Sequence, residues 1–178
     1  LNFDIKSVGL RDILSANMFN LEMYWYGKIK QQEKGKKFES RYSGLYYKHL
    51  TDNVENLSNS DSKKKSIPNR LKWISFKDQF FSTILIAEEH FESPDLESVV
   101  EVESSPYMKS CSAKMSVPFA IDEAKGSSFK FYFGPNHFQT LKNYDKGLKG
   151  SEVLDIQKLV PLGWTLFRWI NRILVIPM

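Results

Sequence analysis

The sequence contains a single cysteine, Cys111, so no disulfide bond can form within the chain. A lone thiol fits the cytosol, and it equally fits an extracytoplasmic protein that does without disulfides. Because Cys111 stands in a serine-rich segment, we expect it to be an unreactive structural residue. With 178 residues, 42% of them hydrophobic, the chain is large enough to fold around a core of its own without disulfide staples.

Long hydrophobic runs are also missing. No apolar run reaches the about 20 residues that a helix needs to cross a bilayer. The sequence opens with "LNFDIKSVGL", which contains neither an initiator methionine nor a secretory signal peptide. We therefore expect the chain to be part of a longer protein, whose location cannot be inferred from the missing signal.

Positive charge is in slight excess, with a formal net charge of +4 and a sequence pI near 9.0. The basic residues are densest in two short segments, "KIKQQEKGKK" and "SDSKKKS". A nucleic-acid-binding surface requires clustered basic residues together with a recognisable motif. We expect both segments to be solvated loops, and we predict no nucleic acid partner.

The sequence lacks the motifs of metal, phosphate and nucleophile chemistry. Its three histidines, His49, His90 and His137, are far apart, and none forms a metal-ligand motif with a cysteine or carboxylate. There is no glycine-rich phosphate loop, nucleophile elbow or zinc-binding helix motif. Glu88 and Glu89 are adjacent in an expected strand and therefore point to opposite faces. We predict no catalytic residue, no metal and no cofactor, and hence no enzyme.

Asp78 is the most interesting carboxylate, because it interrupts the apolar run "FKDQFF". A buried carboxylate can be catalytic, but its burial is costly unless the group is hydrogen bonded. We expect Asp78 to be a loop residue or a hydrogen-bonded structural residue.

Aromatic and β-branched residues predict strands over most of the chain. The expected strands cover residues 20–29, 38–50, two strands or one long bent strand within 71–90, 99–108, 111–121 and 127–135. We expect the first two to form a hairpin, and we expect Pro106 and Pro118 to lie at strand edges or ends. The polar segment 51–69 is predicted to be a mobile loop.

After Pro135 the hydrophobic spacing becomes helical. In "NHFQTLKNYDKG", Asn136 is a candidate helix cap and Gly147 a candidate helix end. Three residues have the spacing of one helical face, namely Phe138, Leu141 and Tyr144. Strands first and helices last predict a mainly β fold, an antiparallel β-sandwich with helices confined to the last quarter.

The final segment, "PLGWTLFRWINRILVIPM", is the most membrane-like part of the chain. A helix over residues 162–176 would be roughly 22 Å long, too short for a hydrocarbon core of about 30 Å. One face would carry Leu166, Phe167, Ile170, Ile173 and Leu174, with Trp169 at its edge, and the opposite face Thr165, Arg168, Asn171 and Arg172. A helix packed on its own domain and a helix lying at a membrane surface both show this pattern.

Four segments together resemble the YidC-type bacterial membrane protein insertases, in the version found in Bacteroidetes-type bacteria. They are "QQEKGKKFESRYSGLYYK", "LKWISFKDQFFSTILIA", "FKFYFGPNHFQTLKNYD" and "LGWTLFRWINRILVIP". The resemblance covers nearly the whole chain, and the segments follow the family's order. It implies the later part of a large periplasmic domain, a partial β-supersandwich without its early strands.

The resemblance also implies a division of the chain and a place for it. Residues 1–158 would form the periplasmic β-sandwich domain, and residues 159–178 an amphipathic helix leading toward a membrane core. The parent would be an inner-membrane protein with this segment on the periplasmic side, assisting insertion and folding of membrane proteins without catalysis. Implied partners are the lipid surface, Sec translocon components and nascent membrane proteins. The implied membrane-interface residues are Trp164, Phe167, Arg168, Trp169, Ile170, Arg172, Ile173 and Leu174.

An alternative function is a carbohydrate-binding or mutarotase-like sugar-processing domain, because the family's fold is related in shape to sugar mutarotases. Such an enzyme needs a histidine and a carboxylate that face each other across a sugar-sized cleft. The sequence shows no such arrangement of its histidines, and a structure distinguishes the two functions.

Overall fold

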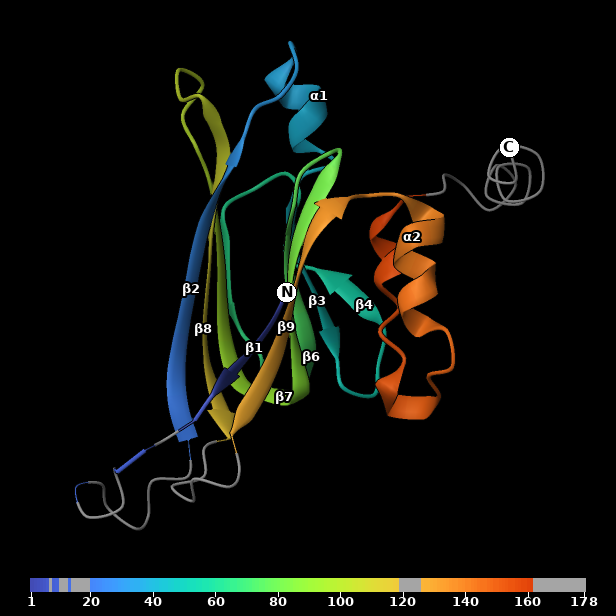
Figure 1. Ribbon diagram of the computed structural model, residues 1–178. Helices are drawn as coiled ribbons and strands as arrows, with labels where there is room; N and C mark the ends of the chain where they lie inside the picture. Colours follow the sequence, from blue (N-terminus) through green and yellow to red (C-terminus); the bar gives the residue numbers. More distant parts are fainter. Residues whose placement is uncertain (7, 10–12, 14–19, 119–125, 162–178) are drawn as a thin grey trace.

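The computed structural model describes residues 1–6, 8–9, 13, 20–118 and 126–161. Within them, an antiparallel nine-stranded sheet folds into two layers (Figure 1). Sheet A has the order β1 (Asn2–Ile5), β9 (Ser127–Pro135), β7 (Phe81–Val100), β6 (Leu71–Lys77), β3 (Gly44–His49) and β4 (Val54–Asn56). Sheet B has the order β2 (Asn20–Lys30), β8 (Tyr107–Pro118), the later half of β7 and β5 (Lys63–Ser66). The prediction of a mainly β, antiparallel fold is confirmed.

Strand β7 belongs to both sheets because it bends near its middle. Its first half pairs with β6 and β9, and its second half pairs with β8 and β5. At the bend, Ser93 has a φ of 45°, Pro94 lacks a backbone N–H, and the pairing with β8 shifts register between Glu92 and Asp95. The bend turns the second half of the strand out of sheet A, so that sheet B faces sheet A.

The core between the sheets is built from alternate residues of their facing strands. It includes Leu45 and Tyr47 of β3, Ile74 and Phe76 of β6, Leu85 and Ala87 of β7, and Cys111, Ala113, Met115 and Val117 of β8. The rings of Trp25 on β2 and Phe76 stack with centroids 3.9 Å apart, which joins the two layers directly.

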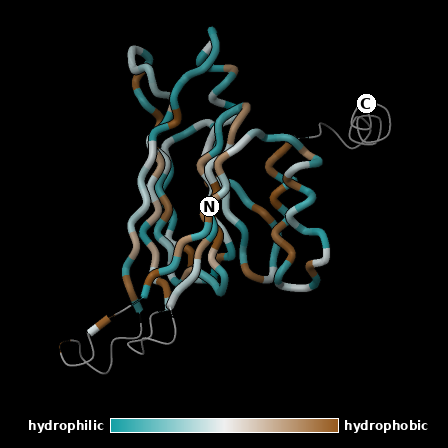
Figure 2. The backbone as a smooth tube through the Cα atoms, in the orientation of Figure 1, coloured by the Kyte–Doolittle hydropathy of each residue, from teal (hydrophilic) through white to brown (hydrophobic). Residues whose placement is uncertain are grey.

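The outer face of sheet A is covered as well. A C-terminal segment packs on it, consisting of α2 (Phe138–Lys142) and three 3₁₀ turns, η1 (Asn143–Asp145), η2 (Gly150–Glu152) and η3 (Ile156–Leu159). Its hydrophobic residues face the sheet (Figure 2). The second core consists of Trp73, Ile84, Ile86, Tyr132, Leu141, Leu154, Ile156 and Leu159. Sheet A is therefore buried on both faces, and Tyr132 of β9 is buried in the second core.

The expected hairpin of residues 20–29 with 38–50 is wrong. Strand β2 pairs with β8, far along the chain, and β3 pairs with β6 and β4. Residues 38–50 are not one strand, because a short helix, α1 (Lys36–Ser40), precedes β3. This helix also lies outside the last quarter of the chain, to which helices were expected to be confined.

Two further expectations fail around the strand ends. The polar segment 51–69 is not a structureless loop, because it contains β4 and β5 and is anchored by buried Leu57 and Ile67. Residues 99–108 do not form a strand of their own, because β7 runs on to Val100 and a turn leads into β8.

Other expectations hold. Strands β6 and β7 are separate, and the prolines flank β8, with Pro106 before it and Pro118 as its last residue. Asp78 is structural, since it accepts hydrogen bonds from the backbone amides of Phe80 and Phe81 in the β6–β7 turn. The prediction that Asn136 caps α2 is wrong, because the cap is the next residue, His137. The His137 ring accepts from the Thr140 amide, whereas the Asn136 side chain binds the carbonyls of the β6–β7 turn.

Buried lysines fix α1 to the end of the sandwich. The Lys109 ammonium donates to the carbonyls of Ser40, Ser43 and Asn59 at 3.1, 2.6 and 2.7 Å. Lys77 donates to the carbonyl of Tyr42. An ammonium group has three donors, so Lys109 meets its full complement in a dry site. Burial lowers the pKa of Lys77 and of Lys109 to about 8.

These lysines predict a gain in stability at alkaline pH. Because their folded pKa lies below the ordinary value, the unfolded chain binds more protons between about pH 8 and pH 10, and stability rises with pH across that window. Cys111 acts in the opposite sense, since burial raises its pKa to about 11. We therefore compare the protein with Lys77→Met, which leaves the Cys111 contribution in place.

The free energy of unfolding of the unaltered protein relative to Lys77→Met should rise by about 1 to 2 kcal/mol between pH 7.5 and 9.5 in urea titrations. The exposed Lys37→Met is the control, for which the relative free energy should stay flat. A flat difference for Lys77→Met as well would show that the Lys77 ammonium is not buried as described.

Candidate functional site

The interface residues predicted for the C-terminal tail lie outside the described residues. They are Trp164, Phe167, Arg168, Trp169, Ile170, Arg172, Ile173 and Leu174. No helix within the described residues is both long and apolar enough to cross a membrane. The candidate sites among the described residues lie on the two-layer sheet and its covering segment.

An aromatic groove lies between the sheets on the side of β2. Trp25 forms its centre, stacked on Phe76 of β6 and packed edge-on against Phe131 of β9, with centroids 5.7 Å apart. Phe131 in turn stacks with Phe3 of β1 and with Phe133. A Cβ at Gly27 would lie 3.1 Å from the Phe76 ring, so the glycine leaves room for this stack. Aromatic rings from four strands thus form one cluster, and Trp25, Phe76 and Phe81 line the opening beside it.

The groove has a volume of about 280 Å³ and a mixed rim. Lys28, Lys30 and Gln32 line it on the side of β2, and Asp78 and Thr83 line it on the side of sheet A. Within the described residues β2 pairs with β8 alone, so its second edge presents backbone N–H and C=O groups beside the groove. Aromatic surface next to an unpaired strand edge is suited to an extended peptide segment.

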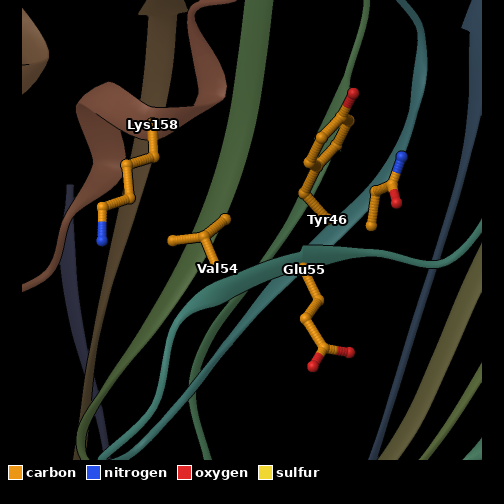
Figure 3. A pocket seen from close by; sticks show the side chains of 5 residues that line it. Tyr46, Val54, Glu55 and Lys158 are labelled. Carbon is orange, nitrogen blue, oxygen red and sulfur yellow. The ribbon is translucent and has the colours of Figure 1, made fainter. Parts of the chain in front are cut away.

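A second cavity, of about 490 Å³, lies on the outer face of sheet A (Figure 3). It is lined by Tyr46, Val54, Asn56 and Lys158 and by the backbone side of Glu55. The Glu55 carboxylate points away from it and accepts a hydrogen bond from the Tyr47 hydroxyl at 2.7 Å. This bond, together with the Lys65 charge, lowers the pKa of Glu55.

The sugar-processing alternative gains no support from this cavity. His49 does approach Glu55, with Nε2 3.5 Å from Oε1, but the carboxylate is on the opposite side of β4 from Tyr46 and Val54. His90 contacts Glu92 on β7, and His137 caps α2. Within the described residues no group of three or more His, Cys, Asp or Glu side chains is placed to hold a metal ion.

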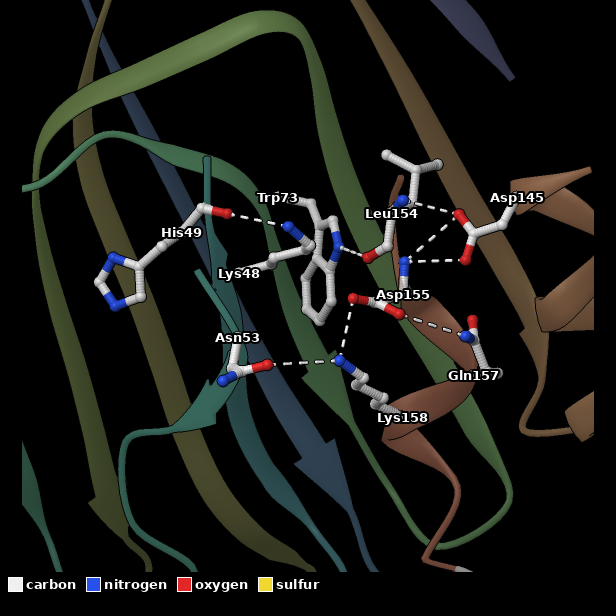
Figure 4. A network of polar contacts seen from close by, with 9 residues as sticks. All are labelled: Lys48, His49, Asn53, Trp73, Asp145, Leu154, Asp155, Gln157 and Lys158. Carbon is white, nitrogen blue, oxygen red and sulfur yellow. Dashed lines mark hydrogen bonds and ion pairs between the residues drawn. The ribbon is translucent and has the colours of Figure 1, made fainter. Parts of the chain in front are cut away.

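A polar network fixes the C-terminal segment to sheet A (Figure 4). The Trp73 indole donates to the Leu154 carbonyl at 2.6 Å. The Asp145 carboxylate accepts from the backbone amides of Leu154 and Asp155. Lys158 bonds Asp155 at 2.9 Å and reaches Asn53 at 3.5 Å. The network determines where the chain leaves the sandwich before residue 162.

Sequence reasoning did not find the groove, because its lining residues come from three separate strands, β2, β6 and β7. Trp25 and Gly27 share the inward face of β2, and a glycine two residues from a tryptophan was the local signal for a close aromatic contact. For Cys111 the expectation of a structural role is confirmed, since its thiol is buried between the sheets and its pKa is raised to about 11.

Comparison with known proteins identifies the family. The sequence profile of the YidC periplasmic domain matches residues 13–177. "Membrane protein insertase YidC" of Parabacteroides distasonis is 46% identical over 100% of this chain and 28% of its own length. The proteins of the same name from Azobacteroides pseudotrichonymphae and Bacteroides fragilis are 44% and 42% identical, over 99% and 97% of this chain and 29% and 28% of their own lengths.

Fold and groove define an antiparallel, two-layer β domain with an opening between its layers. The chain belongs to the YidC periplasmic domain family, so the resemblance read from its four sequence segments is confirmed. It spans about 28% of the length of the first of these relatives. None of the comparisons points to a carbohydrate-binding or sugar-processing protein.

The stacking geometry predicts that Trp25 stabilises the sandwich. Trp25→Ala removes contacts to Phe76 and Phe131, and because Trp25 is half-buried the free energy of unfolding should fall by about 2 to 3 kcal/mol. Urea titration at neutral pH measures the loss. The control is the neighbouring Tyr24→Ala, on the exposed face of β2, which should cost less than about 0.5 kcal/mol. Equal losses would contradict the described stack.

Proposed function

We propose that this chain is the periplasmic part of a membrane protein insertase and that its groove holds extended apolar segments of membrane proteins before or during insertion. The role is one of binding, without catalysis. The observation that carries the proposal is the aromatic groove around Trp25 beside the edge of β2 that has no strand partner among the described residues. Membership of the family, whose relatives are named membrane protein insertase, supports the choice of ligand.

Each part of the groove has a physical role in this proposal. The edge of β2 offers main-chain hydrogen bonds that do not depend on the ligand's sequence, as a site for many different substrates requires. The rings of Trp25, Phe76 and Phe81 provide apolar surface, and Trp25 and Phe76 are held in rigid positions because they stack on each other. The polar side chains of Gln32, Asp78 and Thr83 at its rim keep the empty groove solvated.

The tail belongs to the same proposal. The sequence predicted this helix over residues 159–178, but Leu159 packs in the second core, so the proposed amphipathic helix begins after Pro161. It lies on the periplasmic surface of the inner membrane, with Phe167, Ile170, Ile173 and Leu174 toward lipid and Arg168 and Arg172 toward water or phosphates. Trp164 and Trp169 lie at the headgroup level. On the family resemblance, Sec translocon components are further proposed partners, in addition to nascent membrane proteins.

Photocrosslinking tests the groove. A benzoylphenylalanine replacing Phe81, an exposed ring that lines the groove, should crosslink to an apolar peptide with lysine-capped ends, because the peptide lies in the groove along β2. The same label replacing Tyr24, on the exposed outer face of β2, should not. Addition of Trp25→Ala, in a variant shown by circular dichroism to remain folded, should lower the yield at position 81 about tenfold. Equal crosslinking at positions 24 and 81, or none at 81, would exclude the groove as the binding site.

Vesicle co-sedimentation tests the tail. Ile170→Asp together with Leu174→Asp places two charges on the apolar face and should weaken binding to anionic vesicles by at least about tenfold. Arg168→Gln with Arg172→Gln should weaken binding less, because each charge near the surface contributes about 1 kcal/mol. If the two aspartates leave vesicle binding unchanged, the tail does not contact lipid.

A further inference from the structure

Five exposed aromatic side chains gather at the end of the sandwich where α1 lies (top of Figure 1). This aromatic end surface consists of Phe38, Tyr42, Phe80, Phe81 and Phe133. Phe38, Phe81 and Phe133 are 56%, 55% and 63% exposed, values unusual for phenylalanine in a water-soluble domain. The outer face of β2 carries two exposed aromatics of its own, Tyr24 and Tyr26, which keep a hydroxyl in water.

Contacts between the elements place these side chains together. Lys77, the last residue of β6, donates to the Tyr42 carbonyl and so joins α1 to the β6–β7 turn. That turn carries Phe80 and Phe81, and Phe81 is paired with Pro135 at the end of β9. The rings of Phe38 and Tyr42 lie on the same side of α1, with centroids 5.2 Å apart.

The surface is held rigidly. Lys36 of α1 donates to the carbonyls of Val102, Glu103 and Ser105 in the β7–β8 turn, at 2.6, 3.2 and 3.0 Å. Glu39 of α1 is fully buried and accepts from the amides of Gln32 and Glu33. With Lys77 and Lys109, buried charges thus fix a five-residue helix that could not persist alone. An exposed apolar pair on so rigid a helix indicates a contact with something outside the domain.

The charge around the aromatic rings identifies the contact. Lys30, Lys34, Lys37 and Arg41 are exposed at this end, and Glu33, Glu103 and Asp61 are exposed acidic groups beside them. Aromatic rings that enter the headgroup layer, flanked by cations that reach lipid phosphates, are the pattern of an interfacial membrane contact. A water-soluble protein partner would offer no general reason for combining three phenylalanines with an excess of cations.

We propose that the aromatic end surface docks on an anionic lipid bilayer, as a second membrane contact distinct from the C-terminal tail. Phe38 and Tyr42 enter the headgroup region, and Lys37 and Arg41 meet phosphates. The groove rim at Lys30 and Phe81 belongs to this same end, so the docked domain opens its groove toward the membrane. The inference rests on the proposed insertase function, because it takes the domain to lie close to a bilayer.

Environment-sensitive labels on the whole chain test the orientation. The dye NBD is attached to a cysteine introduced by Lys37→Cys or, as control, by Tyr24→Cys, since native Cys111 is buried and unreactive. With phosphatidylcholine vesicles containing about one third phosphatidylglycerol, the label at 37 should shift to the blue and gain intensity, and the label at 24 should not. Pure phosphatidylcholine should give a weaker response at 37. An unchanged signal at 37 while the chain co-sediments with vesicles would overturn the proposal.

Affinity provides a second measurement. Phe38→Ser with Tyr42→Ser should weaken vesicle binding about tenfold, and the control Tyr24→Ser with Tyr26→Ser should leave it within about twofold. Circular dichroism verifies that each variant is folded. Equal binding by both pairs would overturn the proposal. Because the peptide crosslinking above contains no lipid, its failure would count against the groove alone, and a failure here against the lipid contact alone.

Discussion

The bend in β7 sets the arrangement of both sheets. Because one strand pairs in sheet A before Glu92 and in sheet B after it, the two layers are covalently tied and must face each other. The inner core, the aromatic stack of Trp25 and Phe76, and the opening along β2 follow from this arrangement. The second core is a further consequence of the bend. Sheet B covers one face of sheet A, so the C-terminal segment packs on the other face.

Sequence patterns predicted local structure well wherever the alternation of apolar and polar residues in one segment was sufficient to identify it. Alternation in β2, β6 and β9 and the change to helical spacing after Pro135 each predicted the right element. The pairing of the strands was not predictable. From its sequence, β2 could pair as well with the segment 38–50 as with β8, which is some 80 residues away. The burial of side chains in the folded domain decides which strand it pairs with. The groove was missed for that reason. The buried lysines were not predicted. Lysine is usually exposed, so a lysine such as Lys109 is expected to face solvent even where its strand position faces inward.

The buried charged side chains at the α1 end and the exposed aromatic side chains beside them are structurally related. Lysines 36, 77 and 109 replace the apolar contacts that a short helix lacks, and each is bonded to backbone carbonyls. Because these lysine contacts hold α1 in place, Phe38 and Tyr42 are not needed in the core, and both rings are exposed. Groove and aromatic end surface then meet at Lys30 and Phe81, which places a site for extended segments next to a site for lipid.

We propose that the edge of β2 is an open binding edge for an extended apolar segment. Hydrogen–deuterium exchange of the chain, with and without a lysine-capped apolar peptide, measures whether this edge is free and becomes occupied. Every second amide of Asn20–Lys30 points away from β8 and should exchange fast in the free chain and slowly, by at least about tenfold, with peptide bound. Amides of the central β8 should change little. Protection of β2 amides that already exists without peptide, or that does not change on its addition, would contradict the account.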